Sequence, residues 1–280
     1  MTKFLLHNFI IEKHVKDALA EDIGFGDIST DFLCTDNDIL KAKLNTREDG
    51  ILSGIDVFKM VFKILNPEIR IQTFFNDGDE IKKGDTLATL EGSARGILSG
   101  ERTALNYIQR MSGIATETNK YQKAITPYNA KIVDTRKTTP NFRIFEKYSV
   151  KVGGGSLHRF NLSDCVMLKD NHISFAGSIT NAVKKVRDNI SHAHKIEVEC
   201  DTKEQVKEAL EAKADIIMLD NMSIEDMKFC VNLINKQAIV EASGNVKLHT
   251  INEIASTGVD IISSSAIVAQ AKTLDIALDM

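Results

Sequence analysis

The sequence predicts an α/β protein in which a smaller mixed α/β region precedes a parallel α/β barrel. Two observations predict this fold class. From about residue 130 onward, short apolar runs alternate with helical patterns, which is typical of βαβ units and a parallel sheet. The first third of the chain instead carries strand patterns joined by tight turns, beside amphipathic helices. A length of 280 residues is enough for two such regions.

The elements of the first third follow from apolar spacing and from turn residues. Helical spacing predicts helices over 4–20, 55–65 and 94–112, and Asn66-Pro67 is expected to stop the second of them. Glycine and aspartate indicate a turn region at 21–30. Alternating or bounded apolar stretches predict strands at 41–46, 69–75, around Ile81 and at 86–90.

The second region is expected to hold about seven strand–helix units. The predicted strands are 131–133, 150–152, 166–168, 196–198, 216–219, 238–240 and 260–262. The clearest helices between them are 179–190, 203–212, 224–234 and 248–256. Seven units favour a barrel that is not fully closed, with an open doubly wound sheet as the alternative. No G-x-G-x-x-G motif opens a helix, which argues against a dinucleotide fold.

Composition and charge exclude several classes of protein. The chain carries 35 Lys and Arg against 39 Asp and Glu, and a general nucleic-acid binder would usually be basic. No apolar run approaches the ~20 residues of a membrane span, and no signal-peptide core is present, so no membrane partner is expected. The four cysteines form no C-x-x-C pair, which favours reduced thiols and a cytoplasmic location.

Charged or small polar residues follow most of the predicted strands. In α/β barrels this is the edge that builds the active site. The segments are Asp134-Thr135-Arg136-Lys137, His158-Arg159, Lys169-Asp170, Glu199, Asp220-Asn221, Ser243-Gly244-Asn245 and Ser263-Ser264-Ser265. So many polar strand ends on one edge indicate a single site.

The charges at this edge are segregated. Residues 131–172 hold eight Lys or Arg and four Asp or Glu, a net charge of +4 within a chain of −4. Arg binds carboxylates and phosphates through its planar fork, and Lys adds a mobile point charge. Turns such as Gly153-Gly154-Gly155 let backbone N–H groups approach an anion, whereas Glu199 and Asp220 suit sugar hydroxyls or Mg²⁺. Together these features indicate a site for a multiply phosphorylated sugar and an acid.

Several of these segments, taken together, closely resemble one enzyme family, the quinolinate phosphoribosyltransferases. The most specific motifs are Asp134-Thr135-Arg136-Lys137-Thr138-Thr139-Pro140, Gly153-Gly154-Gly155-Ser156-Leu157-His158-Arg159 and Leu168-Lys169-Asp170-Asn171-His172. The resemblance continues through Leu98–Asn106, Glu197–Glu199, Met218–Asn221 and Glu241–Asn245 and so covers nearly the whole chain.

The resemblance implies a domain organisation and an assembly. It implies an N-terminal α/β sandwich domain at 1–112 and an incomplete seven-stranded, TIM-like α/β barrel at 113–267. The C-terminal tail, about residues 268–280, is a candidate to pack back on the first domain. A homodimer is implied, with a hexamer as an alternative, in which the N-terminal domain of one subunit covers the barrel mouth of the other.

The resemblance also implies a role for each site residue. Arg102 would reach quinolinate bound to the partner subunit, where it would join Arg136, His158, Arg159 and Lys169. Phosphoribosyl pyrophosphate would meet Lys137 and Lys169 through its phosphates, and Glu199 and Asp220 would hold its ribose hydroxyls and Mg²⁺. The remaining substrate residues would be Thr135, and for the 5′-phosphate Ser243, Gly244, Asn245, Ser263, Ser264 and Ser265. Lys137, Lys169, Glu199 and Asp220 would be catalytic.

The implied reaction transfers phosphoribosyl to quinolinate, with Mg²⁺ as cofactor. It releases pyrophosphate and CO₂ and gives nicotinate mononucleotide for NAD biosynthesis. The chain departs from the family where S-x-G-x-L-T-H-S is typical, because residues 263–270 read SSSAIVAQ. Ser265 stands where the family has glycine. The serine would be strained there only if its backbone were in a left-handed conformation.

Two other functions stay open at this point. One is a same-fold sister phosphoribosyltransferase with another substrate, of the kind associated with molybdenum transport. The other is a non-catalytic sensor on the enzyme fold, which the altered Ser265–Ala269 segment would explain. A dicarboxylate substrate is favoured over the first by the joint presence of Arg102, Arg136, His158, Arg159 and Lys169. Catalysis is favoured over the second by the intact Glu199, Asp220 and basic residues.

Overall fold

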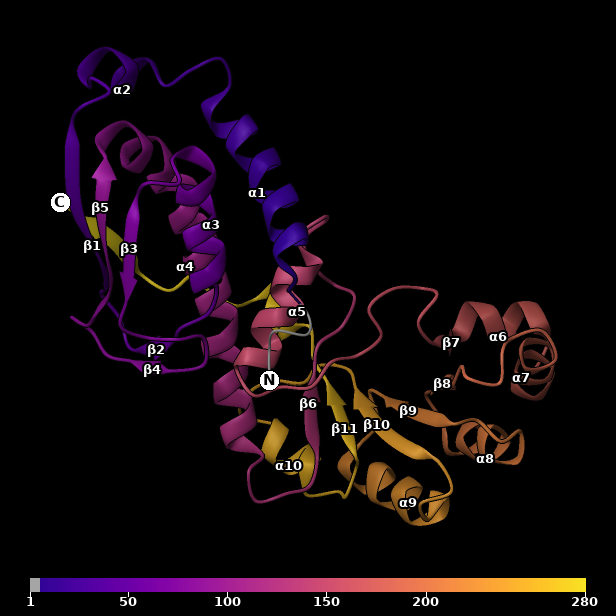
Figure 1. The fold of residues 1–280 in the computed structure, drawn as a ribbon. Coiled ribbons are helices and arrows are strands. Elements are labelled where there is room, and N and C mark those ends of the chain that lie inside the picture. Colours follow the sequence, from indigo (N-terminus) through magenta and orange to yellow (C-terminus); the bar gives the residue numbers. More distant parts are fainter. Residues whose placement is uncertain (1–5) are drawn as a thin grey trace. The chain divides into compact units, whose positions relative to one another are not determined.

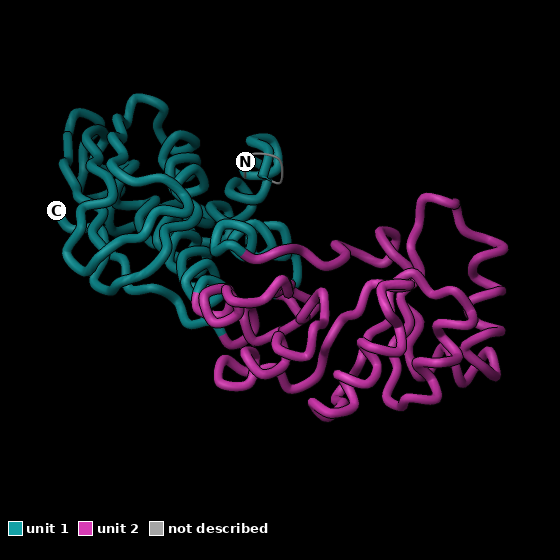
Figure 2. The backbone as a smooth tube through the Cα atoms, turned by 90° about the horizontal axis from the view of Figure 1, so that it is seen from below, with its two compact units in different colours: residues 1–119, 139–154, 271–280 teal, residues 120–138, 155–270 magenta. Residues whose placement is uncertain are grey.

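The structure, a computed structural model, describes residues 6–280 and divides into two compact units. Unit 1 holds the described residues up to 119 together with 139–154 and 271–280, and unit 2 holds 120–138 and 155–270 (Figure 1, Figure 2). Residues 4 and 5 of the helix expected over 4–20 lie outside the described part. Among residues 6–280, no helix combines the length and hydropathy that crossing a membrane requires.

Unit 1 contains a four-stranded antiparallel sheet. Its strands in spatial order are β12 (Ile276–Asp279), β1 (Ile39–Thr46), β5 (Thr86–Ser93) and β3 (Arg70–Thr73). The two shorter strands β2 (Gly50–Ile51) and β4 (Glu80–Ile81) pair separately. The C-terminal strand is antiparallel to β1, with Leu278 opposite Leu44, so the last strand of the chain joins the sheet of unit 1.

Helices supply the rest of unit 1. They are α1 (Asn8–Ile23), α2 (Ile28–Leu33), α3 (Ile55–Leu65), most of α4 (Ala94–Ala124) and α5 (Arg143–Val152). The core forms between one face of the sheet and α1, α3 and α4, because residues of all these elements belong to one buried apolar cluster. Alternate residues of β1 are buried and exposed, as expected for a sheet with one covered face.

Helix α3 shows how local sequence sets the element boundaries. It begins where the Asp77 carboxylate accepts the N–H groups of Gly54 and Ile55, both at 3.0 Å, and so satisfies donors that the first turn leaves unpaired. It ends at Leu65, and Asn66 is already extended, because the residue before a proline is disfavoured in a helix and Pro67 cannot continue one. The prediction of a helix over 55–65 is confirmed.

Two expectations for the first third need correction. The segment 21–30 is more helical than expected, since α1 runs to Ile23 and α2 begins at Ile28, where the Asp27 carboxylate accepts the N–H groups of Ser29 and Thr30. Helix α4 continues twelve residues beyond 112, to Ala124. It continues because apolar residues such as Ile114 and Ala115 stay buried along the same face.

Unit 2 is built on a six-stranded parallel sheet. In spatial order the strands are β6 (Lys131–Val133), β11 (Ile261–Ser263), β10 (Ile239–Ser243), β9 (Ile216–Asp220), β8 (Ile196–Cys200) and β7 (Val166–Leu168). The edge strands β6 and β7 do not pair with each other, so the sheet is not closed. Helices α6 (Asp170–Ala176), α7 (Ile179–Arg187), α8 (Lys203–Glu211), α9 (Ile224–Ile234), α10 (Ile251–Ala255) and α11 (Ala266–Ala269) follow strands of this sheet.

The strand expected at Val150–Val152 is wrong. These residues form the last turn of α5, which buries Val150 completely (Figure 1). A three-residue apolar run looks the same in a buried strand and on the packed face of a helix, so the pattern alone could not decide. In place of a seventh strand, Ser156 makes a single parallel bridge to Val133 of β6.

The parallel sheet gathers its strand ends in one place. The central strands β8, β9 and β10 are largely buried along their length, as expected for a parallel sheet covered on both faces. All six strands run in the same direction, so their carboxyl ends meet at one edge. The polar segments that follow the strands are brought together there.

Candidate active site

A cavity of about 640 Å³ lies at the carboxyl edge of the parallel sheet in unit 2. The predicted site residues that line it are Thr135, Arg136, Lys137, His158, Arg159, Lys169, Glu199, Asp220, Ser243, Gly244, Asn245, Ser263, Ser264 and Ser265. The remaining predicted residue, Arg102, is exposed on α4 and belongs to unit 1.

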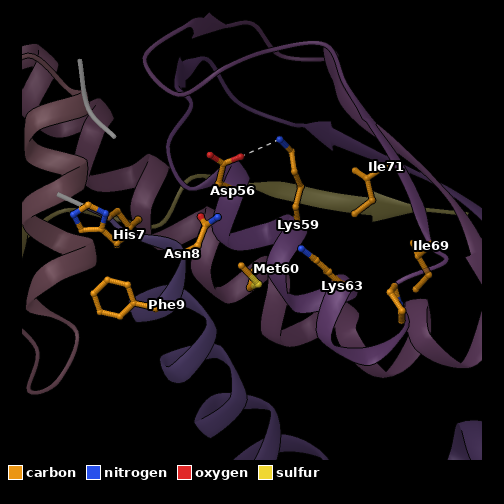
Figure 3. Close-up of a pocket in the computed structure, with 11 residues that line it drawn as sticks. His7, Asn8, Phe9, Asp56, Lys59, Met60, Lys63, Ile69 and Ile71 are labelled. Atoms are coloured by element: carbon orange, nitrogen blue, oxygen red, sulfur yellow. Dashed lines mark hydrogen bonds and ion pairs between the residues drawn. The ribbon is translucent and has the colours of Figure 1, made fainter. Parts of the chain in front are cut away.

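A larger cavity, of about 940 Å³, lies in unit 1 between the start of α1, α3 and β3 (Figure 3). Its lining mixes apolar side chains with two lysines, and Lys59 is already paired with Asp56 at 3.0 Å. It contains none of the residues singled out in the sequence. The convergence of charged strand ends therefore makes the cavity of unit 2 the candidate active site.

The loop after β6 is fixed by hydrogen bonds around its charged residues. The Thr135 hydroxyl accepts the N–H of Lys137 at 3.0 Å, and this tight turn exposes the Lys137 side chain. Further along the loop, the backbone N–H and the hydroxyl of Thr139 both donate to the buried Glu146 carboxylate at 3.0 Å. Arg110 also pairs with Glu146, at 2.9 Å, so this carboxylate anchors the far end of the loop.

Oppositely charged side chains meet at the ends of β7, β8 and β9. The Lys169 ammonium lies 2.6 Å from the Glu199 carboxylate, and Asp220 accepts a hydrogen bond from the Asn221 amide at 2.8 Å. Asn221 also donates its backbone N–H to the Ser243 carbonyl at 3.0 Å, and its side chain accepts from Asn245 at 3.1 Å. Asn221 thus ties the end of β9 to the Ser-Gly-Asn turn after β10.

The small-residue turns behave differently from one another. Gly244 has a φ of +91°, and a Cβ there would lie 2.3 Å from the Asn221 side chain, so both conformation and space require glycine. Ser265 has a φ of −75°, so serine is not strained where the resembled family has glycine. The Gly153–Gly155 run does not line the cavity. Gly153 is instead needed for packing, because its Cβ position lies 2.3 Å from the Ala115 carbonyl of α4.

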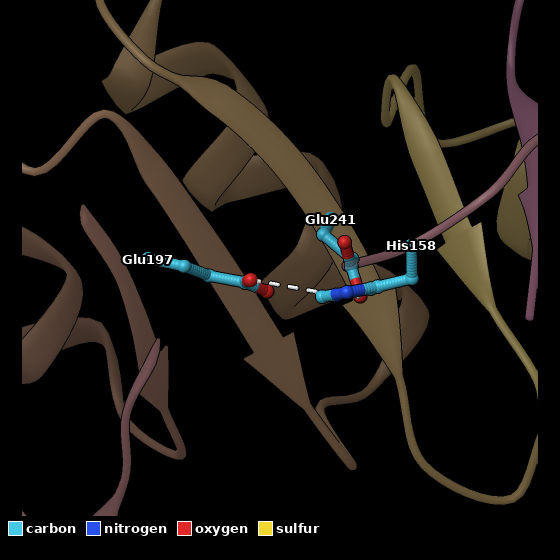
Figure 4. A group of neighbouring side chains, drawn as sticks. All are labelled: His158, Glu197 and Glu241. Carbon is cyan, nitrogen blue, oxygen red and sulfur yellow. Dashed lines mark ion pairs between the residues drawn. The ribbon is translucent and has the colours of Figure 1, made fainter. Parts of the chain in front are cut away.

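Beneath the cavity, His158 faces two buried glutamates, Glu197 of β8 and Glu241 of β10 (Figure 4). Its Nε2 lies 3.3 Å from Glu197 Oε2 and 3.5 Å from Glu241 Oε1. The Nδ1 atom of His158 accepts the backbone N–H of Arg159 at 2.7 Å. The backbone N–H of His158 donates to the Asp134 carboxylate at 2.8 Å. Within residues 6–280, these three side chains are the one acidic–histidine group close enough to share an ion.

The cluster holds more protons than its members would in water. Burial lowers the pKa of His158, but the facing glutamates outweigh it and raise the pKa to about 10. Burial also raises the pKa of Glu197. Both pKa shifts favour one additional proton within the cluster of His158, Glu197 and Glu241. This proton is not on Nδ1 of His158, because Nδ1 accepts a backbone N–H. The additional proton therefore belongs to the carboxylate side of the cluster.

Sequence reasoning assigned no role to part of the lining or to the two glutamates beneath it. Lys247 and Gln270 line the cavity, together with Met167, Met218, Asn221, Val246 and Ala266. A signal for Lys247 existed, since it comes two residues after the Ser-Gly-Asn turn. A signal also existed for Glu197, because residues two apart in a strand share a face, which places Glu197 directly below Glu199.

Two family models match this chain over nearly its whole length. The model described as quinolinate phosphoribosyl transferase, C-terminal domain, matches residues 114–279, and the corresponding N-terminal domain model matches residues 27–112. The chain is 43% identical to the probable carboxylating nicotinate-nucleotide pyrophosphorylase of Synechocystis, over 97% of this chain and 92% of the relative. It is 39% identical to the protein of that name from Bacillus subtilis, over 98% and 95%. The similar protein of Arabidopsis thaliana is named as chloroplastic.

Solved structures agree with the fold. NadC from Streptococcus pyogenes superposes with a TM-score of 0.95 at 41% identity, covering 98% of this chain and 97% of the other. The nicotinate-nucleotide pyrophosphorylase of Francisella tularensis gives a TM-score of 0.93, also at 41% identity and the same coverage. The predicted fold class, an N-terminal α/β sandwich followed by an incomplete α/β barrel, is confirmed, with six strands in the parallel sheet where seven were predicted.

Proposed function

The chain belongs to the quinolinate phosphoribosyl transferase family, and from this premise we propose that the cavity of unit 2 binds quinolinate and phosphoribosyl pyrophosphate together. The protein is a carboxylating nicotinate-nucleotide pyrophosphorylase of NAD biosynthesis. One observation carries the placement of the site. All the residues predicted for the substrates, apart from Arg102, surround a single cavity.

Quinolinate is placed at the basic side of this cavity. Arg136, Arg159 and Lys169 supply cationic groups for its two carboxylates, and arginine suits them because its fork is planar. Arg159 is held in place by a hydrogen bond to the Cys165 carbonyl at 2.9 Å. Both ring nitrogens of His158 face protein groups, so His158 would contact the pyridine through its ring surface.

Phosphoribosyl pyrophosphate is placed along the strand ends. Its 5′-phosphate would lie between the turns Ser243–Asn245 and Ser263–Ser265, whose hydroxyl and N–H groups are suited to an anion. Its ribose hydroxyls would meet Glu199 and Asp220, and its pyrophosphate would meet Lys137 and Lys169. In this arrangement ribose C1 faces the side of the cavity that holds quinolinate.

The donor set at the strand ends fits Mg²⁺. Glu199 and Asp220 end the neighbouring strands β8 and β9, are half-buried and line the same cavity. Mg²⁺ prefers oxygen ligands and is commonly held by one or two carboxylates with substrate phosphates and water. When bound, Mg²⁺ would neutralise charge on the pyrophosphate leaving group.

The chain's own residues would act mainly by orientation and charge. The pyridine nitrogen of quinolinate displaces pyrophosphate from ribose C1, and the arginines hold the ring so that this nitrogen points at C1. Lys137 and Lys169 would stabilise the charge that grows on the departing pyrophosphate. The positively charged ring nitrogen then stabilises the electron pair that stays on the neighbouring ring carbon when its carboxylate leaves as CO₂, and a proton takes the place of that carboxylate. The cations therefore must not hold that carboxylate more tightly before the reaction than during it.

We also infer a homodimer with shared sites, with a hexamer as the alternative assembly. Support comes from the family resemblance together with Arg102, a member of the predicted substrate set that is exposed on α4 of unit 1. If the partner supplies Arg102, two inactive variants should complement each other. In a mixed dimer, the intact cavity of the Arg102→Ala subunit receives Arg102 from the Lys169→Ala subunit. Mixed subunits should regain about a quarter of wild-type activity, because half of the dimers are mixed and each has one complete site. Mixtures that stay inactive would contradict the shared site.

A cytoplasmic location stays a prediction. The cysteines Cys34, Cys165, Cys200 and Cys230 are free thiols, which supports a reducing compartment.

The decisive test of function is an assay that follows CO₂ and nicotinate mononucleotide together. Purified protein would receive phosphoribosyl pyrophosphate and Mg²⁺ with quinolinate, nicotinate or nicotinamide. Products are expected from quinolinate alone, in equal amounts, and should disappear when EDTA removes Mg²⁺. Folded, dimeric protein that makes no product from quinolinate would favour the sister enzyme or the sensor.

A further inference from the structure

The two glutamates beneath the cavity are buried and have few polar partners. Glu197 is fully buried and Glu241 is 1% exposed. Among the described residues, neither Glu197 oxygen accepts a hydrogen bond of standard geometry, and the same holds for Glu241 Oε1. A buried carboxylate without a hydrogen-bond donor is strongly unfavourable, and the imidazole that faces both glutamates offers its Nε2–H as a donor. The side chain of His158 is itself 11% exposed, and that remaining surface belongs to the cavity.

The backbone fixes which way the imidazole is protonated. Nδ1 accepts the N–H of Arg159 at 2.7 Å and therefore carries no proton. The ring proton must then be on Nε2, the atom that lies 3.3 Å from Glu197 and 3.5 Å from Glu241. At these lengths Nε2 lies between the two carboxylates, within ion-pair distance of both. The ring is held from both sides, by main chain at Nδ1 and by carboxylates at Nε2.

A metal ion would be a different occupant of the same three side chains. The separations are compatible with ligands around an ion with bonds of about 2.0–2.2 Å. However, a metal-bound imidazole normally donates a proton from its other nitrogen to a neighbouring acceptor. Here the other nitrogen meets a donor, so Nε2 carries a proton and has no lone pair for a metal. The direction of the Arg159 N–H therefore favours the hydrogen-bonded cluster.

We propose that Glu197 and Glu241 are positioning residues that act through His158, fixing its ring plane and its Nε2–H form as a rigid wall against which quinolinate is placed. The N–H that donates to Nδ1 is the backbone N–H of Arg159, so a shift of the His158 ring would also shift Arg159. The contribution to quinolinate binding rests on the proposed function, whereas the state of the imidazole does not.

The sharpest test compares two substitutions of similar volume at each glutamate. In Glu197→Gln and Glu241→Gln the side-chain oxygen can still accept the Nε2 proton, whereas Glu197→Met and Glu241→Met remove the acceptor and keep the bulk. If the glutamates only fill space, the methionine variants should work as well as the glutamines, because an apolar replacement of a buried charge is often neutral or stabilising. If they position His158, the glutamine variants should work and the methionine variants should not.

The first readout needs no substrate. Histidine-selective ¹⁵N NMR distinguishes a ring nitrogen that carries a proton from one that does not, and a His158→Gln variant assigns the signal. Wild type and both glutamine variants should show a bare Nδ1 and a protonated Nε2. The Glu197→Met/Glu241→Met double variant should show a mixture of ring states or an exchange-broadened signal.

The second readout compares the effect of each substitution on the KM for quinolinate with its effect on the KM for phosphoribosyl pyrophosphate. Each methionine substitution should raise the KM for quinolinate about tenfold, while the KM for phosphoribosyl pyrophosphate stays within about twofold and the melting temperature does not fall. Asp215→Asn is the matched control. It removes a carboxylate at the opposite edge of the same strands, where Asp215 accepts the Ile196 N–H at 2.8 Å, and should leave both the KM values and the NMR signal unchanged.

Several results would overturn the proposal. Methionine variants with wild-type NMR signals would show that the glutamates do not set the ring. So would a stoichiometric transition metal that co-purifies with wild type and is lost from the methionine variants. If quinolinate is not a substrate at all, the NMR comparison still decides whether the glutamates fix the imidazole, so failure of the proposed function is separable from failure of this inference.

Discussion

Lys169 and Glu199 form an ion pair of 2.6 Å at the mouth of the cavity, between the ends of β7 and β8. The side chain of Lys169 is 45% exposed and that of Glu199 is 16% exposed. Such a partly exposed ion pair is weak, so a phosphate group of the substrate can replace Glu199 as the partner of Lys169 with little loss of free energy.

Removal of either main cation should abolish turnover without unfolding the protein. Lys169→Ala and Arg136→Ala are expected to lower kcat/KM by about 10²-fold or more, because charge on the substrates then goes uncompensated. Steady-state kinetics with circular dichroism measures both effects. Lys195→Ala is the control, since Lys195 is exposed at the opposite edge of the sheet. Unimpaired turnover in the two cavity variants would contradict the site.

The fold was predictable wherever the sequence carried a long periodic signal with a stop. Helices over 55–65 and 224–234 have an amphipathic spacing and clear boundaries, and both are present. Val150–Val152 was misassigned because three apolar residues have no period. The single bridge at Ser156 depends on long-range packing that no local pattern encodes.

The residues that line the cavity were more predictable from sequence than the glutamates beneath it. Parallel topology brings every strand end to one edge, so polar residues after strands could be collected from sequence alone. Glu197 and Glu241 lie on β8 and β10, which are separated by β9, and meet only because both face His158. Their relationship depends on sheet curvature and side-chain direction, which sequence spacing does not give.

His14 should make the stability of unit 1 depend on pH. The Tyr107 hydroxyl lies 2.5 Å from His14 Nδ1, and burial raises the pKa of Tyr107, so the phenol is the donor. Burial lowers the pKa of His14, although a hydrogen bond with the Asn141 backbone opposes the shift. The unfolded chain therefore binds more protons than the folded one between the lowered pKa and about 6.5, and the free energy of unfolding should fall as pH drops through that window.

Denaturant unfolding at several pH values measures this dependence. His14→Asn should flatten it, because asparagine does not titrate and its side-chain oxygen can still accept from Tyr107. His192→Asn, which changes an exposed loop residue, should leave the wild-type slope. An unchanged slope in His14→Asn would assign the pH dependence to other groups.

Ser265→Gly should change little, although it restores the residue typical of the family. The φ of −75° at Ser265 is available to any amino acid, so glycine relieves no strain there. We expect the KM for phosphoribosyl pyrophosphate to stay within about threefold of wild type, on the scale of the few tenths of a kcal/mol typical of neutral surface changes. A tenfold improvement would mean that the serine side chain obstructs the phosphate.

Gly244→Ala should weaken both the fold and phosphoribosyl pyrophosphate binding. The φ of +91° disfavours any Cβ, and the new methyl group would also lie 2.8 Å from the Asn221 backbone nitrogen. We expect a loss of about 2–4 kcal/mol in the free energy of unfolding, from conformational strain together with overpacking. The KM for phosphoribosyl pyrophosphate should rise tenfold or more, by about 1.4 kcal/mol or more in binding, because the turn would move away from Asn221.

Gly84→Ala separates the two causes. Gly84 has a nearly equal φ of +95° but open space around its Cβ position, and it lies in a turn of unit 1. Its replacement should therefore show the conformational loss alone, about 1–2 kcal/mol, with unchanged kinetics. The difference between the two variants measures the steric contact with Asn221. Equal losses of stability, with equal KM values, would mean that the turn adapts and that Asn221 does not fix its position.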